Sequence, residues 1–326
     1  MYTKQSEHCP VTAIFSETST CKKNHHRQTI NLQRTFFLRI IHGLRKMALS
    51  KPFITTLCLF MLTPNIMPSN NSLAESPPIQ ITVSILPQRY FVQKLAGNRA
   101  KITIMVLPGS SPATYEPTPN QLRHITCSKI YFSIGVPFEN VWIERFSSLN
   151  PDMLIVHTEV VNTNKKDPHI WLSPALVKKQ IHIMAQALIK VDPVYRETYK
   201  KNLARFENDI SNLDKRIRAI FSKRGKRKEF LVLHPAWGHF AFAYGLKQIS
   251  INREGKEPSA KALANLLSYI KEKGFNTIFV QPQLSRKKAE TIAREIKGKI
   301  IFIDPLSEDW EKNLEKTAIQ IYKGLR

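Results

Sequence analysis

The feature that most constrains the fold is one long, uninterrupted helical pattern in the middle of the chain. Residues 193–221 begin with a proline and then contain neither proline nor glycine. Apolar side chains recur in this stretch at helical spacing, at Leu203, Phe206, Ile210, Leu213, Ile217 and Ile220. At 1.5 Å per residue, the pattern predicts a helix about 40 Å long. A helix of this length is a natural bridge between two halves of one chain.

Short apolar runs alternate with amphipathic segments on both sides of this helix. Strands are predicted at residues 79–85, 102–107, 130–134 and 153–156, and again at 230–233, 248–251, 277–280 and 299–303. Helices are predicted at residues 88–96, 118–127 and 174–189, and at 260–273, 286–296 and 310–322. Such alternation is typical of parallel sheets covered by helices. We therefore expect an α/β protein with an N-terminal lobe (75–192), a linking helix (193–222) and a C-terminal lobe (223–326).

The first 74 residues differ in character from the rest of the chain. Residues 1–46 are polar and basic with no evident fold, so we expect an unstructured extension, unless translation begins at Met47. Residues 47–74 have the pattern of a secretory signal peptide: a charge at Lys51, an apolar run over 52–62, and small residues before Glu75. The apolar run is too short to span a membrane comfortably. We expect export to the periplasm with cleavage after Ala74.

The charge balance is strongly basic, with a formal net charge of +24 from 49 basic and 25 acidic side chains. Such a charge can attract nucleic acid or an anionic membrane surface. The sequence has no nucleic-acid-binding motif and no glycine-aromatic platform, so we expect no nucleic-acid partner. The densest basic run, residues 223–228, follows the long helix, where it complements the negative helix C-terminus.

Two histidines and one aspartate occupy loops that follow or precede predicted elements. His169 lies between Pro168 and Pro174, and His234 ends the apolar run of residues 230–233. Asp304 ends a third apolar run. Imidazole and carboxylate groups are common ligands of divalent cations, and zinc in particular favours nitrogen donors. Alternatively, each histidine is a hydrogen-bonded loop residue, and Asp304 caps the turn that follows it.

Several motifs together carry a resemblance to a known family. They are residues 108–119 (PGSSPATYEPTP), 167–174 (DPHIWLSP), 234–240 (HPAWGHF), 254–259 (EGKEPS) and 304–306 (DPL). In combination they resemble the substrate-binding proteins of zinc and manganese ABC importers, the ZnuA/TroA-like family, over roughly residues 79–325. The resemblance implies a periplasmic protein, not an enzyme, that captures a divalent metal between two lobes and delivers it to an ABC-transporter permease. It also implies that the linking helix limits hinge motion.

The chain departs from the family pattern at its first metal ligand. In the family, a histidine directly follows the proline of the Pro-Gly-x-x-Pro turn, but this chain has Ala113, which carries no donor atom. The resemblance implies that His169, His234 and Asp304 fill the other three ligand positions. Water or another side chain could take the fourth. His157, twelve residues before His169, is one candidate, although it could equally hydrogen-bond within its own loop.

Three functions fit these observations to different degrees. The leading hypothesis is a monomeric capture protein for zinc, with manganese as the alternative if carboxylates dominate the ligand shell. A second is a degenerate relative with weak metal affinity that binds another solute or a protein partner. A third is a zinc hydrolase with an open metal position. The absence of a His-Glu-x-x-His segment and of an evident nucleophile–base pair disfavours the hydrolase.

Overall fold

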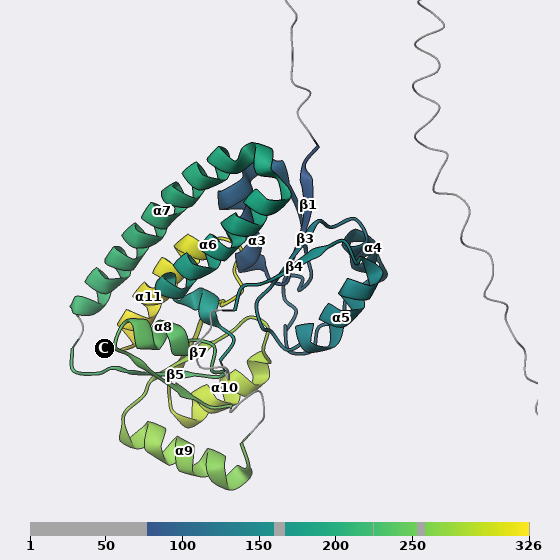
Figure 1. Ribbon diagram of the computed structural model, residues 1–326. Helices are drawn as coiled ribbons and strands as arrows, with labels where there is room; N and C mark the ends of the chain where they lie inside the picture. The colour runs from purple at the N-terminus through teal and green to yellow at the C-terminus, as the bar shows by residue number, and fades with distance from the viewer. Residues whose placement is uncertain (1–76, 160–166, 224, 253–257, 326) are drawn as a thin grey trace, which may run out of the picture. The chain divides into compact units, whose positions relative to one another are not determined.

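The computed structural model describes residues 77–159, 167–223, 225–252 and 258–325. The predicted extension, the signal peptide with its cleavage position, and most of the 254–259 motif lie outside the described residues. Within them, two four-stranded parallel sheets are each flanked by helices (Figure 1). This arrangement confirms the predicted α/β fold with two lobes.

The two sheets have the same strand order. The N-terminal sheet contains β1 (Ile79–Val83), β2 (Ala100–Ile104), β3 (Ile130–Ser133) and β4 (Leu154–His157), in the order β2-β1-β3-β4. The C-terminal sheet contains β5 (Glu229–Val232), β6 (Lys247–Ser250), β7 (Thr277–Val280) and β8 (Lys299–Phe302), in the order β6-β5-β7-β8. All neighbouring strands are parallel. The carboxyl ends of the four strands therefore meet at one edge of each sheet.

The helices cover these sheets. The N-terminal lobe has α3 (Leu86–Ala96), α4 (Pro119–Ile125), α5 (Glu139–Leu149) and α6 (Pro174–Val191). The C-terminal sheet is followed or covered by α8 (Gly238–Ala243), α9 (Ala260–Glu272), α10 (Arg286–Glu295) and α11 (Trp310–Gly324). Start signals in the sequence explain several helix boundaries. At α4, the Thr118 hydroxyl accepts a hydrogen bond from the Gln121 backbone N–H, while the Gln121 side chain accepts one from the Thr118 N–H. This reciprocal capping box, with Pro119 in the first turn, fixes where α4 begins.

Helix α7 (Arg196–Ser222) is the predicted long helix, preceded by a 3-10 turn at Pro193–Tyr195. Its buried face consists of Tyr199, Phe206, Ile210, Leu213, Ile217 and Phe221, each at most 1% exposed. These residues recur at spacings of three, four or seven, so they form one apolar stripe. The stripe packs against α3 and α6 of the N-terminal lobe and against α11 at the end of the chain (Figure 1). Helix α7 therefore joins the two lobes.

Two buried tryptophans connect segments that are far apart in sequence. The Trp310 indole N–H donates to the backbone carbonyl of Trp171 at 2.6 Å, and the Trp171 indole N–H donates to the carbonyl of Pro305 at 2.7 Å. Both side chains are at most 2% exposed. Buried indole N–H groups require such partners, so this pair fixes the two loops against each other. It holds the loop of His169 close to the segment that follows Asp304.

Two helices and several strand boundaries differ from the sequence-based prediction. Helix α5 was not predicted, because its apolar residues do not fall on one face: the side chains of Val141 and Leu149 are 56% and 45% exposed. Helix α8 has only six residues, too few to show a helical period. Strand β2 begins two residues earlier than predicted and ends at Ile104. No helix in the described ranges is long and apolar enough to cross a membrane.

Candidate metal centre

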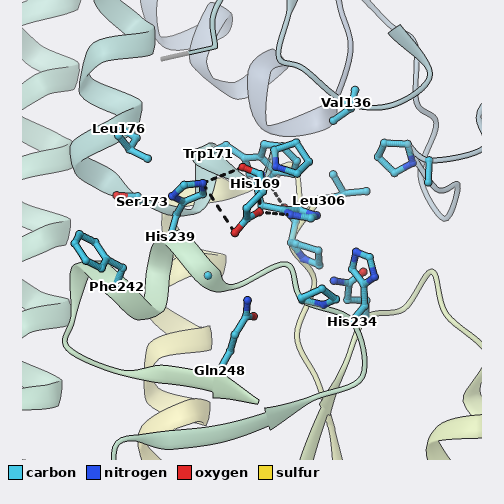
Figure 2. Close-up of a pocket in the computed structure, with 18 of the residues that line it drawn as sticks. Val136, His169, Trp171, Ser173, Leu176, His234, His239, Phe242, Gln248 and Leu306 are labelled. Carbon is cyan, nitrogen blue, oxygen red and sulfur yellow. Dashed lines mark hydrogen bonds and ion pairs between the residues drawn. The ribbon is translucent and has the colours of Figure 1, made fainter. Parts of the chain in front are cut away.

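A cavity of about 1140 Å³ is lined by residues of both lobes. Its walls include Ala113, Val136, His169, His234, His239 and Leu306. Figure 2 labels Val136, His169, His234, His239 and Leu306 among the side chains of this cavity, with His169 beside Trp171. Ligands of α/β proteins commonly bind at the carboxyl ends of parallel strands. His234 is the second residue after β5, so the cavity lies where such a site is expected.

The ring of His169 is held by an aspartate two residues earlier. Its Nδ1 lies 2.7 Å from Asp167 Oδ1, and its backbone N–H donates to the same oxygen at 3.1 Å. The ring also packs against Trp171, with centroids 5.2 Å apart. A carboxylate bonded to one ring nitrogen leaves the other, Nε2, to bind a ligand. This arrangement is typical of metal-binding histidines.

Glycine is required where the Asp167 carboxylate meets the start of α8. A Cβ atom at Gly238 would lie 2.4 Å from Asp167 Oδ2, well inside van der Waals contact. A side chain at this position would therefore displace the carboxylate that holds His169.

His234 presents a neutral imidazole to the same cavity. Its ring centroid lies 5.6 Å from that of His169, with the two planes at 75°. Burial and the neighbouring His169 lower the pKa of His234 to about 4, although the nearby Asp167 acts in the opposite direction. At neutral pH the ring therefore keeps a lone pair available to a cation. With zinc–nitrogen bonds of about 2.0–2.1 Å, a single ion is small enough to lie between two rings at this separation.

Asp304 borders a different, smaller cavity of about 260 Å³. Its Oδ1 accepts hydrogen bonds from Gln283 Nε2 and from the Leu306 backbone N–H, both at 2.9 Å. The second bond is the turn-capping role that the sequence left open as an alternative. Gln283 lines both cavities and therefore lies between the carboxylate and the space that the histidines face.

His157 lies apart from the two imidazoles. It is the last residue of β4, its side chain is 63% exposed, and its Nδ1 is 2.9 Å from Ser133 Oγ and 3.6 Å from Glu159 Oε2. It does not line the cavity that contains His169 and His234. A role for His157 as a metal ligand stays a prediction.

Ala113, by contrast, does line the cavity, where the family resemblance implies a ligand. Its backbone N–H donates to Ser111 Oγ at 3.3 Å, and the neighbouring Pro112 carbonyl accepts from the Phe138 N–H at 3.2 Å. Backbone hydrogen bonds therefore hold Ala113 in the cavity wall, but its side chain has no atom that could bind a metal. Across the described parts of the chain, no three His, Cys, Asp or Glu side chains are grouped so that they could hold a metal ion.

Comparisons with known proteins identify the family. Residues 81–324 match the family model described as "Zinc-uptake complex component A periplasmic". The chain belongs to this family. It is 27% identical over 267 residues to the high-affinity zinc uptake system protein ZnuA of Bacillus subtilis, covering 72% of this chain and 82% of that protein. It is also 27% identical to a putative metal-binding protein of Chlamydia trachomatis, over 72% of this chain and 87% of that protein.

A solved structure gives the same result. The fold matches a crystal structure of ZnuA with a TM-score of 0.73 and 37% sequence identity, covering 76% of this chain and all of that one. The predicted family is thus confirmed. As a member of the zinc-uptake component A family, the chain is the substrate-binding protein of an ABC transport system, and it binds metal rather than acting as an enzyme.

Sequence reasoning about this family member did not identify two residues beside the histidine pair. Asp167 orients His169, and its backbone carbonyl also lies 2.9 Å from His239 Nε2. His239 is only 13% exposed and lines the cavity, but this contact occupies its Nε2. Figure 2 shows His239 and His234 on opposite sides of His169. An acidic residue two positions before a loop histidine was the signal available in the sequence for Asp167.

Proposed function

We propose that this chain captures a divalent metal ion, zinc foremost, between its two lobes and delivers it to an ABC-transporter permease. The observation that carries the proposal is the pair of imidazoles, His169 and His234, in one cavity lined by both lobes. The names of the relatives support the metal, since the matching Bacillus subtilis protein is described as a zinc uptake protein.

The donor atoms favour zinc among the common divalent cations. Both candidate ligands are imidazoles, one oriented by Asp167 and the other neutral at physiological pH because of burial. Nitrogen donors suit zinc, whereas magnesium and calcium prefer oxygen ligands. Manganese is the alternative cargo and becomes competitive only if carboxylates dominate the bound shell.

We propose Asp304 as the assisting carboxylate. Its Oδ1 is bonded to Gln283 Nε2, and Gln283 borders the cavity of the histidines. A shift of the Gln283 side chain toward solvent would free the carboxylate for a cation, because the other partner of Oδ1 is a backbone N–H that a metal-bound carboxylate can keep. His157 would join only if β4 and its following loop approached the cavity on binding.

The proposed location is the periplasm, reached through the signal peptide of residues 47–74. We expect the described part to act as a monomer that docks on its permease only transiently.

A direct zinc titration tests this function. The metal-stripped mature protein is titrated with zinc and with manganese against a chromophoric chelator of known affinity. We expect one zinc ion per chain and weaker binding of manganese. A crystal grown with zinc, measured at the zinc absorption edge, should place the anomalous peak between His169 and His234. A peak elsewhere would reassign the site.

One observation favours the second candidate function, a relative with weak affinity for the bare ion. The described residues contain no group of three metal-binding side chains, and Ala113 lacks the donor that the family motif supplies. Failure to bind either metal in the titration would support this candidate and exclude the capture of a free ion.

A further inference from the structure

We propose that the cargo is a chelated metal: a divalent ion already held by a small anionic chelator with carboxylate and amine donors. The inference rests on the proposed function, because it concerns the form in which the same site takes up its metal. Four observations support it, namely the number of donors, the space around them, the unpaired glutamine amides and the charge of the walls.

The protein donors that face the cavity are too few for a bare ion. Zinc is normally held by four ligands, or by three protein ligands with one open position. In the described residues, the cavity offers the imidazoles of His169 and His234. Asp304 borders a separate cavity and is bonded to Gln283, and the Nε2 of His239 is taken by the Asp167 carbonyl. Two further donors on the ion would complete the shell. A bidentate chelator carries both in one molecule.

The space next to the two imidazoles suits an organic molecule. The cavity measures about 1140 Å³, and small-molecule sites typically measure about 300–1,000 Å³. Much of its wall near position 113 is apolar, formed by Pro112, Ala113, Val136 and Pro137. A hydrated ion gains nothing from such a wall, whereas the apolar surface of an organic chelator is stabilised by burial against it.

Two glutamine amides border the same space. Gln281 is 8% exposed, and its Nε2 has no hydrogen-bond partner among the described residues; the same holds for Gln283 Oε1. One group is a donor and the other an acceptor. A ligand with both carboxylate and amine groups can pair with each after a small rotation of the amides, whereas a bare cation can pair only with the acceptor.

The charge of the walls also favours a chelate over a free dication. Most of the formal net charge of +24 lies in residues 75–326, the part expected to remain after cleavage, and Arg218, which pairs with Asp214, is among the residues that line the cavity. The carboxylate that lines it, Asp167, is already bonded to His169. The field of a basic protein lowers the local concentration of free dications, while a neutral or anionic chelate is not repelled.

Native mass spectrometry and a metal titration test the inference together. The metal-stripped protein is titrated with zinc alone, with zinc premixed with L-histidine, and with zinc premixed with citrate. We expect at least one chelator to be retained, one molecule per chain together with one zinc, and to tighten zinc binding at least about tenfold.

The opposite result is distinct from failure of the proposed function. If both chelators only compete for zinc, so that apparent affinity falls and no ternary mass appears, the inference is overturned while zinc capture stands. If zinc binds in none of the three forms, the proposed function fails as well.

Two variants at the exposed Ala113 distinguish the effect of an added metal donor from the effect of reduced cavity space. Ala113→His adds an imidazole to the wall, so it should tighten zinc alone and reduce retention of the chelator. Ala113→Leu adds bulk without a donor, so it should weaken chelate binding about tenfold, and more than it weakens the binding of zinc alone. If the parent and Ala113→Leu bind the chelate equally well, the chelator does not contact this wall, and the inference is overturned.

Discussion

At the carboxyl ends of β1 and β3 in the N-terminal lobe, buried side chains pair with one another and with the backbone, whereas at the carboxyl end of β5 in the C-terminal lobe His234 faces the cavity. Below the N-terminal edge, the Glu139 carboxylate accepts hydrogen bonds from the backbone N–H groups of Ile134 and Gly135 and from the Ser84 hydroxyl. Gln88 adds bonds to the carbonyls of β3. At the C-terminal edge, His234 faces open space and the amide of Gln281 is not fully paired.

This difference arises between sheets of identical strand order, so topology alone does not determine which edge binds a ligand. Buried polar groups that are fully paired make a rigid wall. Polar groups left without protein partners are available to a ligand. We therefore expect variants at the C-terminal edge and its facing loop to change metal affinity, and variants of the N-terminal network to change stability instead.

The largest expected effect comes from His234→Ala. Removing one of two imidazoles should weaken zinc binding by more than about 100-fold, beyond the 10–100-fold loss typical of residues that only orient a ligand. His169→Ala should behave alike. Zinc titration of folded, metal-stripped protein measures the loss.

His182→Ala is the matched control for these variants. This histidine lies on α6 and pairs with Glu207 of α7 at 2.7 Å, and it does not line the cavity. It should bind zinc like the parent. If His234→Ala and His182→Ala have the same affinity, the ligand assignment is wrong.

A smaller effect is expected from Asp167→Asn. The amide keeps the shape of the side chain but loses the charge that supports His169 Nδ1 as a donor. Outer-shell substitutions of this kind cost about 10–100-fold in metal affinity. A titration that gives the parent's affinity would show that the carboxylate only positions the loop.

The fold could be predicted where burial imposes a clear period. Helix α7 was predicted because its apolar stripe recurs without interruption, and β7 because all four of its residues are buried. Helix α5 was not predicted, since exposed Val141 and Leu149 interrupt its stripe. Local propensity cannot show which apolar residues tertiary packing leaves exposed.

The candidate site could be predicted only in part. Strand ends and proline-bounded loops pointed to His169 and His234, which the structure brings within 5.6 Å of each other. Spacing did not reveal that Gln283 lies between Asp304 and the cavity, nor that Asp167 holds the ring of His169. The first depends on a contact between segments 21 residues apart, and the second on the side-chain rotamers of two residues in one loop, which spacing alone does not fix.

His157→Ala tests whether the N-terminal edge joins the metal shell. Because its ring bonds to Ser133 and lies outside the cavity, we expect zinc affinity to change by less than about threefold, far below the effect expected of a true ligand. A loss of tenfold or more would mean that His157 moves to the metal on binding and replaces the donor missing at Ala113.

The smallest effect on affinity is expected from Glu139→Gln, which should act on stability alone. Burial raises the pKa of Glu139 to about 7, above its ordinary value of 4.5, and the neighbouring Glu159 adds to the rise. Between pH 4.5 and 7 the folded protein keeps a proton that the unfolded chain has released. Stability from this group is therefore fully present below pH 4.5 and lost as pH rises to 7, by about 3 kcal/mol at 1.4 kcal/mol per pKa unit.

Glutamine mimics the protonated acid, because its amide can donate to Ser84 while its oxygen accepts from the N–H groups of Ile134 and Gly135. Urea unfolding of the parent and the variant at pH 5 and pH 8 isolates this contribution, since Glu159, Tyr131 and the other titrating groups are common to both proteins. The parent should lose more stability than Glu139→Gln between these pH values, while zinc affinity at pH 8 stays within about twofold, since the network lies outside the candidate metal shell. Equal losses of stability would mean that Glu139 is ionised throughout this range. A large loss of zinc affinity would mean that this network also shapes the metal-binding cavity.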